Sequence, residues 1–366
     1  MQKVTPLQIY MLFTQFLYAT TVGFYIRPLA REAGFSAWIS VFLGSIAGML
    51  LVYLTYRLAV KRPTQFFGQY GQDIMGKPIH ILLTVIMVFS FLFSASYILR
   101  ELLGLMAAFY LQGTPTWAVA ALFGICIARV VRSGIGTIFR GAQGLFFFSV
   151  ISAISIPFLV NKKMNGDMAI ALLTNIDPPG IWNGTILMTA LFGEMVVILF
   201  FFPHFAQVNK TMKSLGWATF TSVIITLCGF VSILLLFGPD LTANLTMPTL
   251  EMIRYVKFGS FFQNLDPLLI VFWLYSMFIK ISLFLYTAVI GLTHILGLKD
   301  HKPLSTLMTA AMVILSLYMV RSVVELDHLL QNGELAFLLI TEMIPLLYLI
   351  VDWIRSFRMR RQSGIS

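Results

Sequence analysis

The sequence contains few cysteines, few histidines and few charged residues. Its two cysteines, Cys126 and Cys228, both lie in apolar stretches, which predicts packed, reduced side chains rather than a disulfide framework. The five histidines are scattered without metal-ligand spacing, and there is neither an H-E-x-x-H run nor a Ser-His-Asp elbow. We therefore expect no metal, no cofactor and no enzymatic activity.

The shortage of charge also decides the class of protein. Charged residues make up 11% of the 366 residues and hydrophobic residues 58%, with a mean hydropathy of +0.87, whereas soluble domains carry about 25% charged residues. This composition predicts an all-α integral membrane protein. The first apolar stretch begins near Leu7 and is not followed by an A-x-A-like cleavage site, so we expect it to be a retained helix rather than a signal peptide.

Ten apolar stretches are long enough to cross a bilayer. They lie near 7–26, 37–60, 79–111, 116–131, 143–160, 182–206, 216–238, 267–297, 303–321 and 335–354. With five spans in each half, the second half enters the membrane from the opposite side, which is the geometric condition for an inverted repeat. We expect one transmembrane domain, 1–366, with inverted repeats over about 7–160 and 182–354.

Lysine and arginine predict the orientation. They gather in the loops that would lie inside if the N-terminus is inside, as in Lys61, Arg62 and Arg132, and are fewer in the opposite loops, which include Lys162 and Lys163. This bias predicts that both termini are cytoplasmic. It also assigns the net charge of +10 to anionic lipid at the inner leaflet. No basic soluble domain is present to bind nucleic acid.

Two spans in corresponding positions of the two halves are interrupted at their midpoints. The first contains Thr20-Thr21-Val22-Gly23, and the sixth contains Phe192-Gly193-Glu194. Broken helices of this kind free backbone groups that hold a small molecule at mid-membrane. For the first span, a continuous helix whose Gly23 allows close packing is an equal alternative. The pair of interruptions predicts a 5+5 inverted-repeat fold with broken helices 1 and 6.

Glu194 and Lys280 are opposite charges inside two of the spans. A carboxyl near the bilayer centre costs about 2.5–3.5 kcal/mol, so it marks a candidate functional site. Glu194 could bind a ligand ammonium, titrate as a proton gate, form a structural ion pair, or be a protonated carboxyl bonded to a neighbouring helix. Lys280 is its natural counter-charge, and it could instead occupy the place of a coupling cation.

Three other polar residues are candidates for the site. Tyr97 in the third span is expected to line a cavity, since a buried hydroxyl needs a partner, while Arg100 and Glu101 on the same face are expected at the outer interface. Thr287 shares the helical face of Lys280. Glu342 in the last span is a further intramembrane acid without an evident partner, and it is a candidate for an ion, proton or gating pathway.

Motifs in three regions occur in an order that resembles a known family. They are Thr5-Pro-Leu-Gln8 through Arg27-Pro28, Ala33-Gly34 and Ala37-Trp38-Ile39-Ser40; Phe192-Gly193-Glu194 followed by Pro203; and Ile290-Gly291-Leu292-Thr293 followed by Leu298-Lys299. With these motifs the chain resembles the B subunits of GerA-type spore germinant receptors, which belong to the amino acid–polyamine–organocation transporter superfamily. The resemblance covers essentially the whole chain.

The resemblance implies a LeuT-like fold with a germinant pocket between helices one, three, six and eight. Carried over position by position, the pocket consists of Thr21, Val22, Gly23, Tyr97, Gly193, Glu194 and Thr287. The family often has a Gly-x-Gly-like opening in helix one, where this chain has Ala19-Thr20-Thr21-Val22-Gly23. The implied partners are a membrane-anchored A subunit and a lipoprotein C subunit in the spore inner membrane.

These observations predict a nutrient-sensing membrane subunit that triggers germination, with an amino acid as the expected nutrient. Two alternatives use the same residues. One is a proton-coupled amino acid transporter that works through Glu194 or Lys280. The other is a partner-gated water or ion pathway that uses Glu194, Tyr97 and Glu342 as polar stations.

Overall fold

The computed structural model describes residues 3–254, 266–320, 325 and 335–362. Within these residues the chain is almost entirely helical, and the β-structure consists of one isolated bridge between Val4 and Phe205. The first helix starts at a capping box, in which Thr5 and Gln8 bond reciprocally to each other's backbone N–H groups. This arrangement satisfies donors that an open helix end would leave unpaired.

The helix bounds agree closely with the predicted spans. The main helices are α1 (Pro6–Thr20), α2 (Ile26–Ala33), α3 (Ala37–Val60), α5 (Lys77–Leu105), α6 (Thr116–Ser133), α8 (Phe146–Val160), α10 (Pro178–Gly193), α11 (Thr211–Asn244), α13 (Asp266–Ile295), α14 (Lys302–Tyr318) and α16 (Leu335–Gln362). Shorter helices between them are α4 (Phe67–Met75), α7 (Ile135–Gly144), α9 (Ala171–Thr174) and α12 (Pro248–Arg254). The last residue of the predicted span 303–321 lies outside the described residues.

Eight stretches of the described chain are long and apolar enough to cross a membrane. The first, Pro6–Val60, contains α1, α2 and α3, and Lys302–Tyr318 is a shorter apolar helix. The all-helical membrane architecture is confirmed, while the number of ten spans stays a prediction.

The first helix is interrupted where the sequence predicted, but the interruption is a widened turn rather than an unwound segment. The α-helix ends at Thr20, residues Thr21–Tyr25 form a π-helical turn (η1), and α2 continues from Ile26. A π-helical turn keeps the chain helical but displaces carbonyls from the regular hydrogen-bond ladder, and it occurs frequently at functional sites. Because side-chain donors reach these carbonyls, as described below, the chain need not unwind further.

The sixth predicted span changes its helix type at Glu194. The α-helix α10 ends at Gly193, and Glu194–Phe200 form a 3₁₀ helix (η6) that is buried throughout. A 3₁₀ stretch winds more tightly than an α-helix, so the side chain of Glu194 leaves the helix at the junction. Both predicted interruptions therefore exist, as changes of helical winding.

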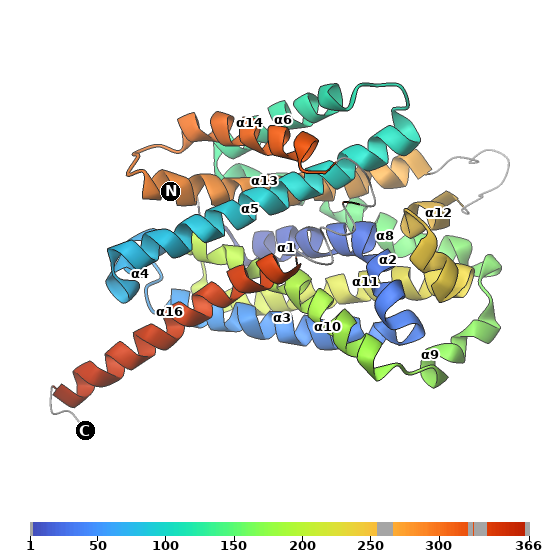
Figure 1. The fold of residues 1–366 in the computed structure, drawn as a ribbon, viewed down its shortest axis with the longest axis horizontal. Helices are drawn as coiled ribbons and strands as arrows, with labels where there is room; N and C mark the ends of the chain where they lie inside the picture. The colour runs from blue at the N-terminus through green and yellow to red at the C-terminus, as the bar shows by residue number, and fades with distance from the viewer. Residues whose placement is uncertain (1–2, 255–265, 321–324, 326–334, 363–366) are drawn as a thin grey trace.

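The helices form an elongated bundle in which segments far apart in the sequence lie side by side (Figure 1). Helix α3 packs along α10, α5 along α13, and α1 along α11. Close approach of α3 and α10 depends on Gly44 and Gly48, where an added Cβ would clash with Met188 and Phe192 respectively. Small residues at such crossings are typical of membrane helices.

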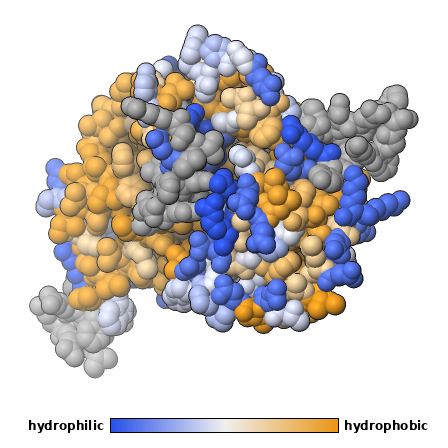
Figure 2. Space-filling model, turned by 45° about the vertical axis from the view of Figure 1, so that its right-hand side comes forward, coloured by the Kyte–Doolittle hydropathy of each residue, from blue (hydrophilic) through white to orange (hydrophobic). Residues whose placement is uncertain are grey.

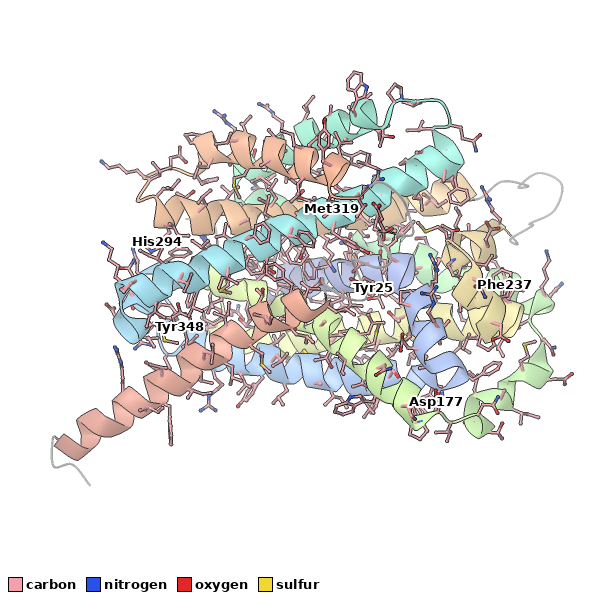
Figure 3. All side chains as sticks on the ribbon, in the orientation of Figure 1. Tyr25, Asp177, Phe237, His294, Met319 and Tyr348 are labelled. Carbon is pink, nitrogen blue, oxygen red and sulfur yellow. The ribbon has the colours of Figure 1, made fainter. Side chains whose placement is uncertain are left out.

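The two ends of the bundle differ in which residues they carry. The chain starts and finishes at the same end in Figure 1. His294 and Tyr348 lie toward that end, and Asp177 and Phe237 lie toward the opposite end (Figure 3). A common end for both termini agrees with an even number of crossings.

Large apolar side chains cover much of the outer surface. Hydrophobic residues form broad areas of the face in Figure 2. Exposed examples are Phe42, Ile46, Leu122, Phe147, Phe158 and Leu307. An apolar surface of this extent is incompatible with water and is expected against lipid.

Candidate functional site

An ion pair joins α13 to the junction of α10 and η6. The ammonium of Lys280 donates a hydrogen bond to Oε2 of Glu194, and their side chains are 0% and 4% exposed. Nζ of Lys280 also donates to the Thr20 hydroxyl oxygen, at 2.6 Å. Three helical segments thus meet at one buried charge pair, and Lys280 pairs with Glu194, which is one of the two roles expected for it.

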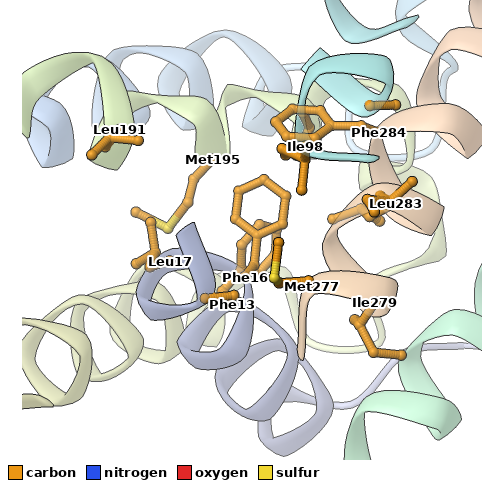
Figure 4. Packing of buried hydrophobic residues seen from close by; sticks show 14 of the residues in the cluster. Phe13, Phe16, Leu17, Ile98, Leu191, Met195, Met277, Ile279, Leu283 and Phe284 are labelled. Atoms are coloured by element: carbon orange, nitrogen blue, oxygen red, sulfur yellow. The ribbon is translucent and has the colours of Figure 1, made fainter. Parts of the chain in front are cut away.

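Aromatic rings complete the surroundings of the lysine. Its ammonium lies 4.6 Å from the centre of the Phe16 ring and 5.7 Å from that of Phe284. Phe16 projects from α1 into the middle of the bundle, with Phe284, Ile98 and Met195 around it (Figure 4). The ring faces attract a cation, and more strongly when water is excluded. The site is therefore built to hold a positive charge in an apolar interior.

Side chains from α12 and α13 bond the carbonyls of the widened turn. The indole nitrogen of Trp273 donates to the carbonyl of Ala19 at 2.6 Å, and the Thr249 hydroxyl donates to the carbonyl of Val22 at 2.5 Å. The Trp273 ring also lies so close to Gly23 that no Cβ would fit there. In the first span the backbone groups predicted for a ligand are thus bonded by the protein itself.

A second polar chain, which the sequence analysis missed, lies one turn from the ion pair. The hydroxyls of Tyr18 and Ser276 are 2.8 Å apart, and Ser276 also donates to Oε1 of Gln15 at 3.3 Å. Nε2 of Gln15 donates in turn to the Ala142 carbonyl of α7, at 2.6 Å. The signal was present: Gln15 and Tyr18 are three residues apart in an apolar helix, and Ser276 precedes Lys280 by one turn. These bonds fix α1 against α7 and α13.

Glu342 of α16 reaches the site at the end of α10, next to Glu194. Its carboxylate packs against Gly193, where an added Cβ would collide with Oε2. The side chain is 2% exposed, and neither carboxylate oxygen has a hydrogen-bond partner among the described residues. It acts electrostatically on both Glu194 and Lys280. Two acids and one base therefore share this part of the interior.

The other predicted pocket residues are buried but bonded within their own helices. Thr21 donates to the Leu17 carbonyl and Thr287 to the Leu283 carbonyl, both at 2.8 Å. The Tyr97 hydroxyl donates to Oε1 of Glu101 at 2.9 Å. Gly193, Glu194 and Lys280 meet in one cluster that includes Glu342, while Thr287 lies about two turns farther along α13 than Lys280.

One small cavity adjoins the widened turn. Its volume is about 30 Å³, which suits about one water molecule. It is lined by Tyr18, Val22, Ser149, Ser152, Ala153, Ile156, Ile225, Gly229, Thr249, Met252, Ile253 and Trp273. Among the predicted pocket residues, Val22 lines this cavity. The cavity is too small to hold an amino acid.

Comparisons with known proteins place this geometry in context. The family model described as "Spore germination protein" matches residues 3–324. The chain is 28% identical to spore germination protein KB of Bacillus subtilis, over 78% of this chain and 77% of that protein. It is 20% identical to spore germination protein GerQB of Bacillus cereus, over 95% of both chains.

The fold also matches a solved structure. The crystal structure of MhsT in complex with L-phenylalanine superposes with a TM-score of 0.71 at 14% identity, covering 95% of this chain and 89% of that one. The likeness confirms the predicted LeuT-like fold. At this identity it speaks for the fold alone.

Proposed function

Since the chain belongs to the spore germination protein family, we propose that it is the nutrient-sensing membrane subunit of a spore germinant receptor. In this proposal a small nutrient, an amino acid, binds where α1, η6 and α13 meet, and binding triggers germination through partner subunits. The role is recognition and signalling rather than catalysis. Its support is the family match, the transporter-like fold and one buried charge pair.

The pairing of Lys280 with Glu194 is the observation that carries the proposal. A Lys side chain ends in a primary ammonium, which is also the cationic group of an amino acid. In the closed structure, the ammonium of Lys280 holds the position at Glu194 that the ammonium of a ligand would take. A ligand ammonium can therefore replace Lys280 at Glu194 without leaving the carboxylate unpaired, which a buried charge does not tolerate.

Binding requires the bundle to open. The cavity beside η1 has room for about one water, and Trp273 and Thr249 hold the turn carbonyls. An amino acid thus needs a second conformation in which these side chains have moved. A ligand that binds the open form more tightly shifts the population toward it, and this shift is the proposed signal.

The proposed partners follow from the family resemblance. They are a membrane-anchored A subunit and a lipoprotein C subunit, assembled with this chain in the spore inner membrane. Both termini would face the spore core, in agreement with the excess of Lys and Arg in the loops on that side. Relatives named as spore germination proteins support a role in such a receptor.

Spores that carry Glu194→Gln test the proposal. Glutamine keeps the shape but removes the charge that attracts an ammonium, so we expect the response to amino acids to be lost while the protein remains in the membrane. Glu251→Gln is the matched control, since Glu251 bonds Arg254 in short helix α12 at 3.5 Å, away from the pair. A wild-type response from Glu194→Gln spores would exclude this role for Glu194.

A further inference from the structure

Glu342 is a buried acid that no group in the described structure satisfies. It is 2% exposed, and both carboxylate oxygens lack a hydrogen-bond donor. An ionised carboxylate without a donor or counter-ion is strongly disfavoured in an apolar interior, where it keeps its proton instead. The buried charges of this site therefore sum to zero in the closed structure when Glu342 is neutral and Lys280 is paired with Glu194.

The charged and titratable side chains around Glu342 lie on a few neighbouring helices. Glu194 on η6 and Lys280 on α13 act on it electrostatically. On neighbouring elements, His80 of α5 is bonded to Tyr348 of α16, at 2.7 Å. Asp352 of α16 is bonded to Lys61 and Arg62 at the end of α3, and Arg355 bonds the Asp73 carbonyl of α4. These groups are engaged farther along α16, about two turns or more from Glu342. Among the described groups named here, Lys280 is therefore the cation that can pair with Glu342.

We propose that Glu342 is the reserve counter-ion of Lys280, to which the ammonium of Lys280 transfers whenever Glu194 is neutralised or occupied. Gly193 makes the transfer geometrically feasible: without a side chain, it lets the Glu342 carboxyl pack directly against the residue before Glu194. Lysine, with its flexible stem, can turn from one carboxylate to the other.

The exchange conserves charge. Before it, Lys280 is cationic, Glu194 is anionic and Glu342 carries a proton. Afterwards an incoming ammonium pairs with Glu194, Lys280 pairs with Glu342, and the proton of Glu342 has passed to water. Counted over the ammonium of the ligand and these three side chains, one cationic group enters and one proton leaves. The carboxylate of an amino acid takes no part in this exchange, so the ligand class is an amine bound at the expense of a proton. The ligand half rests on the proposed function, whereas the reserve role of Glu342 does not.

Infrared spectroscopy of the purified full-length protein tests the transfer without any ligand. The carbonyl stretch of a protonated carboxyl is separate from that of a carboxylate. We expect a protonated-carboxyl band in the wild type that Glu342→Gln removes. We also expect Glu194→Gln to remove it, because Lys280 then pairs with an ionised Glu342, while Glu251→Gln leaves it unchanged.

Two results would overturn the proposal. If Glu342→Gln leaves the band unchanged, Glu342 does not carry a proton; if the Glu342 band persists in Glu194→Gln, Lys280 does not transfer.

Thermal unfolding gives a second readout. The Glu194→Gln/Glu342→Gln double variant deprives Lys280 of both carboxylates, so its melting temperature should fall by more than the sum of the two single shifts. Additive shifts would contradict the shared counter-ion.

These measurements separate this inference from the proposed function. A loss of the amino acid response in Glu194→Gln spores together with a persistent Glu342 band would retain the nutrient site and reject the reserve counter-ion. The reverse combination would retain the counter-ion and reject the nutrient site.

Discussion

The indole nitrogen of Trp273 lies 2.6 Å from the carbonyl oxygen of Ala19, so α13 supplies a donor to the turn where α1 changes from α- to π-helical winding. The same indole ring also lies against Gly23, four residues farther along the chain. Trp273 precedes Lys280 by seven residues, which places both near one face of α13. One helix thus stabilises the widened turn of α1 and neutralises Glu194.

Replacing Trp273 with Phe should destabilise the closed bundle by about 1–3 kcal/mol, because it leaves a buried carbonyl without its donor. Trp217→Phe is the control, since Trp217 is 54% exposed on α11, and its effect should be small. Thermal unfolding in detergent measures both. Equal melting temperatures for Trp273→Phe and the wild type would show that this bond does not hold the turn.

Removing the cation of the pair should be more costly than removing both charges. Lys280→Met leaves Glu194 buried without its counter-ion, and losing one partner of a buried pair typically costs about 3–5 kcal/mol. The double variant Glu194→Gln/Lys280→Met removes both charges and should recover most of that loss. Chemical denaturation of the two variants gives the comparison, and a double variant no more stable than Lys280→Met would refute the argument.

Gly48→Ala should weaken the packing of α3 on α10. The new Cβ would meet Phe192 and the backbone at Gly193, and overpacking of this kind costs about 1–3 kcal/mol. Gly216→Ala in α11 is a matched control, because nothing lies within 4 Å of its added Cβ. The melting temperature should fall for Gly48→Ala alone. A fall of the same size in both variants would point to helix propensity rather than contact.

Asp352→Asn should have a smaller effect than Lys280→Met. Asp352 bonds Lys61 at 2.6 Å and Arg62 at 3.0 Å, but these cations are 39% and 30% exposed. Ion pairs with this much access to water contribute about 1 kcal/mol or less and weaken with added salt. The difference in melting temperature between wild type and Asp352→Asn should therefore be small at low salt and smaller still at high salt. A difference that is large and independent of salt would be inconsistent with this account.

The helices were predictable because the membrane imposes their length and composition. The predicted span 37–60 coincides with α3, where apolar residues predominate between Ala37 and Val60 and Arg57 in the last turn carries the one charge. The type of helical winding at the interruptions was harder to predict. The sequence Thr20-Thr21-Val22-Gly23 indicated a disturbed helix, but whether it unwinds or widens depends on donors such as Trp273 and Thr249, which are more than 200 residues away.

The candidate site was predictable where charge alone decides the pairing. Two opposite charges inside apolar spans made an ion pair one of the expected arrangements, and Lys280 does bond Glu194. Glu342 appeared without a partner in the sequence, and its oxygens have none among the described residues. Its packing on Gly193 is a tertiary contact that no local pattern encodes. The assignment of a ligand to the predicted pocket stays a prediction for all of its residues, which are Thr21, Val22, Gly23, Tyr97, Gly193, Glu194 and Thr287.

Equilibrium binding and uptake of labelled proteinogenic amino acids, by wild-type protein and Glu194→Gln in proteoliposomes, tests the central claim most directly. The account predicts that at least one amino acid binds the wild type saturably, that Glu194→Gln loses this binding, and that the vesicles accumulate no amino acid. Accumulation driven by a proton gradient would establish the transporter alternative instead. Undiminished binding by Glu194→Gln would contradict a nutrient site at the Lys280–Glu194 pair.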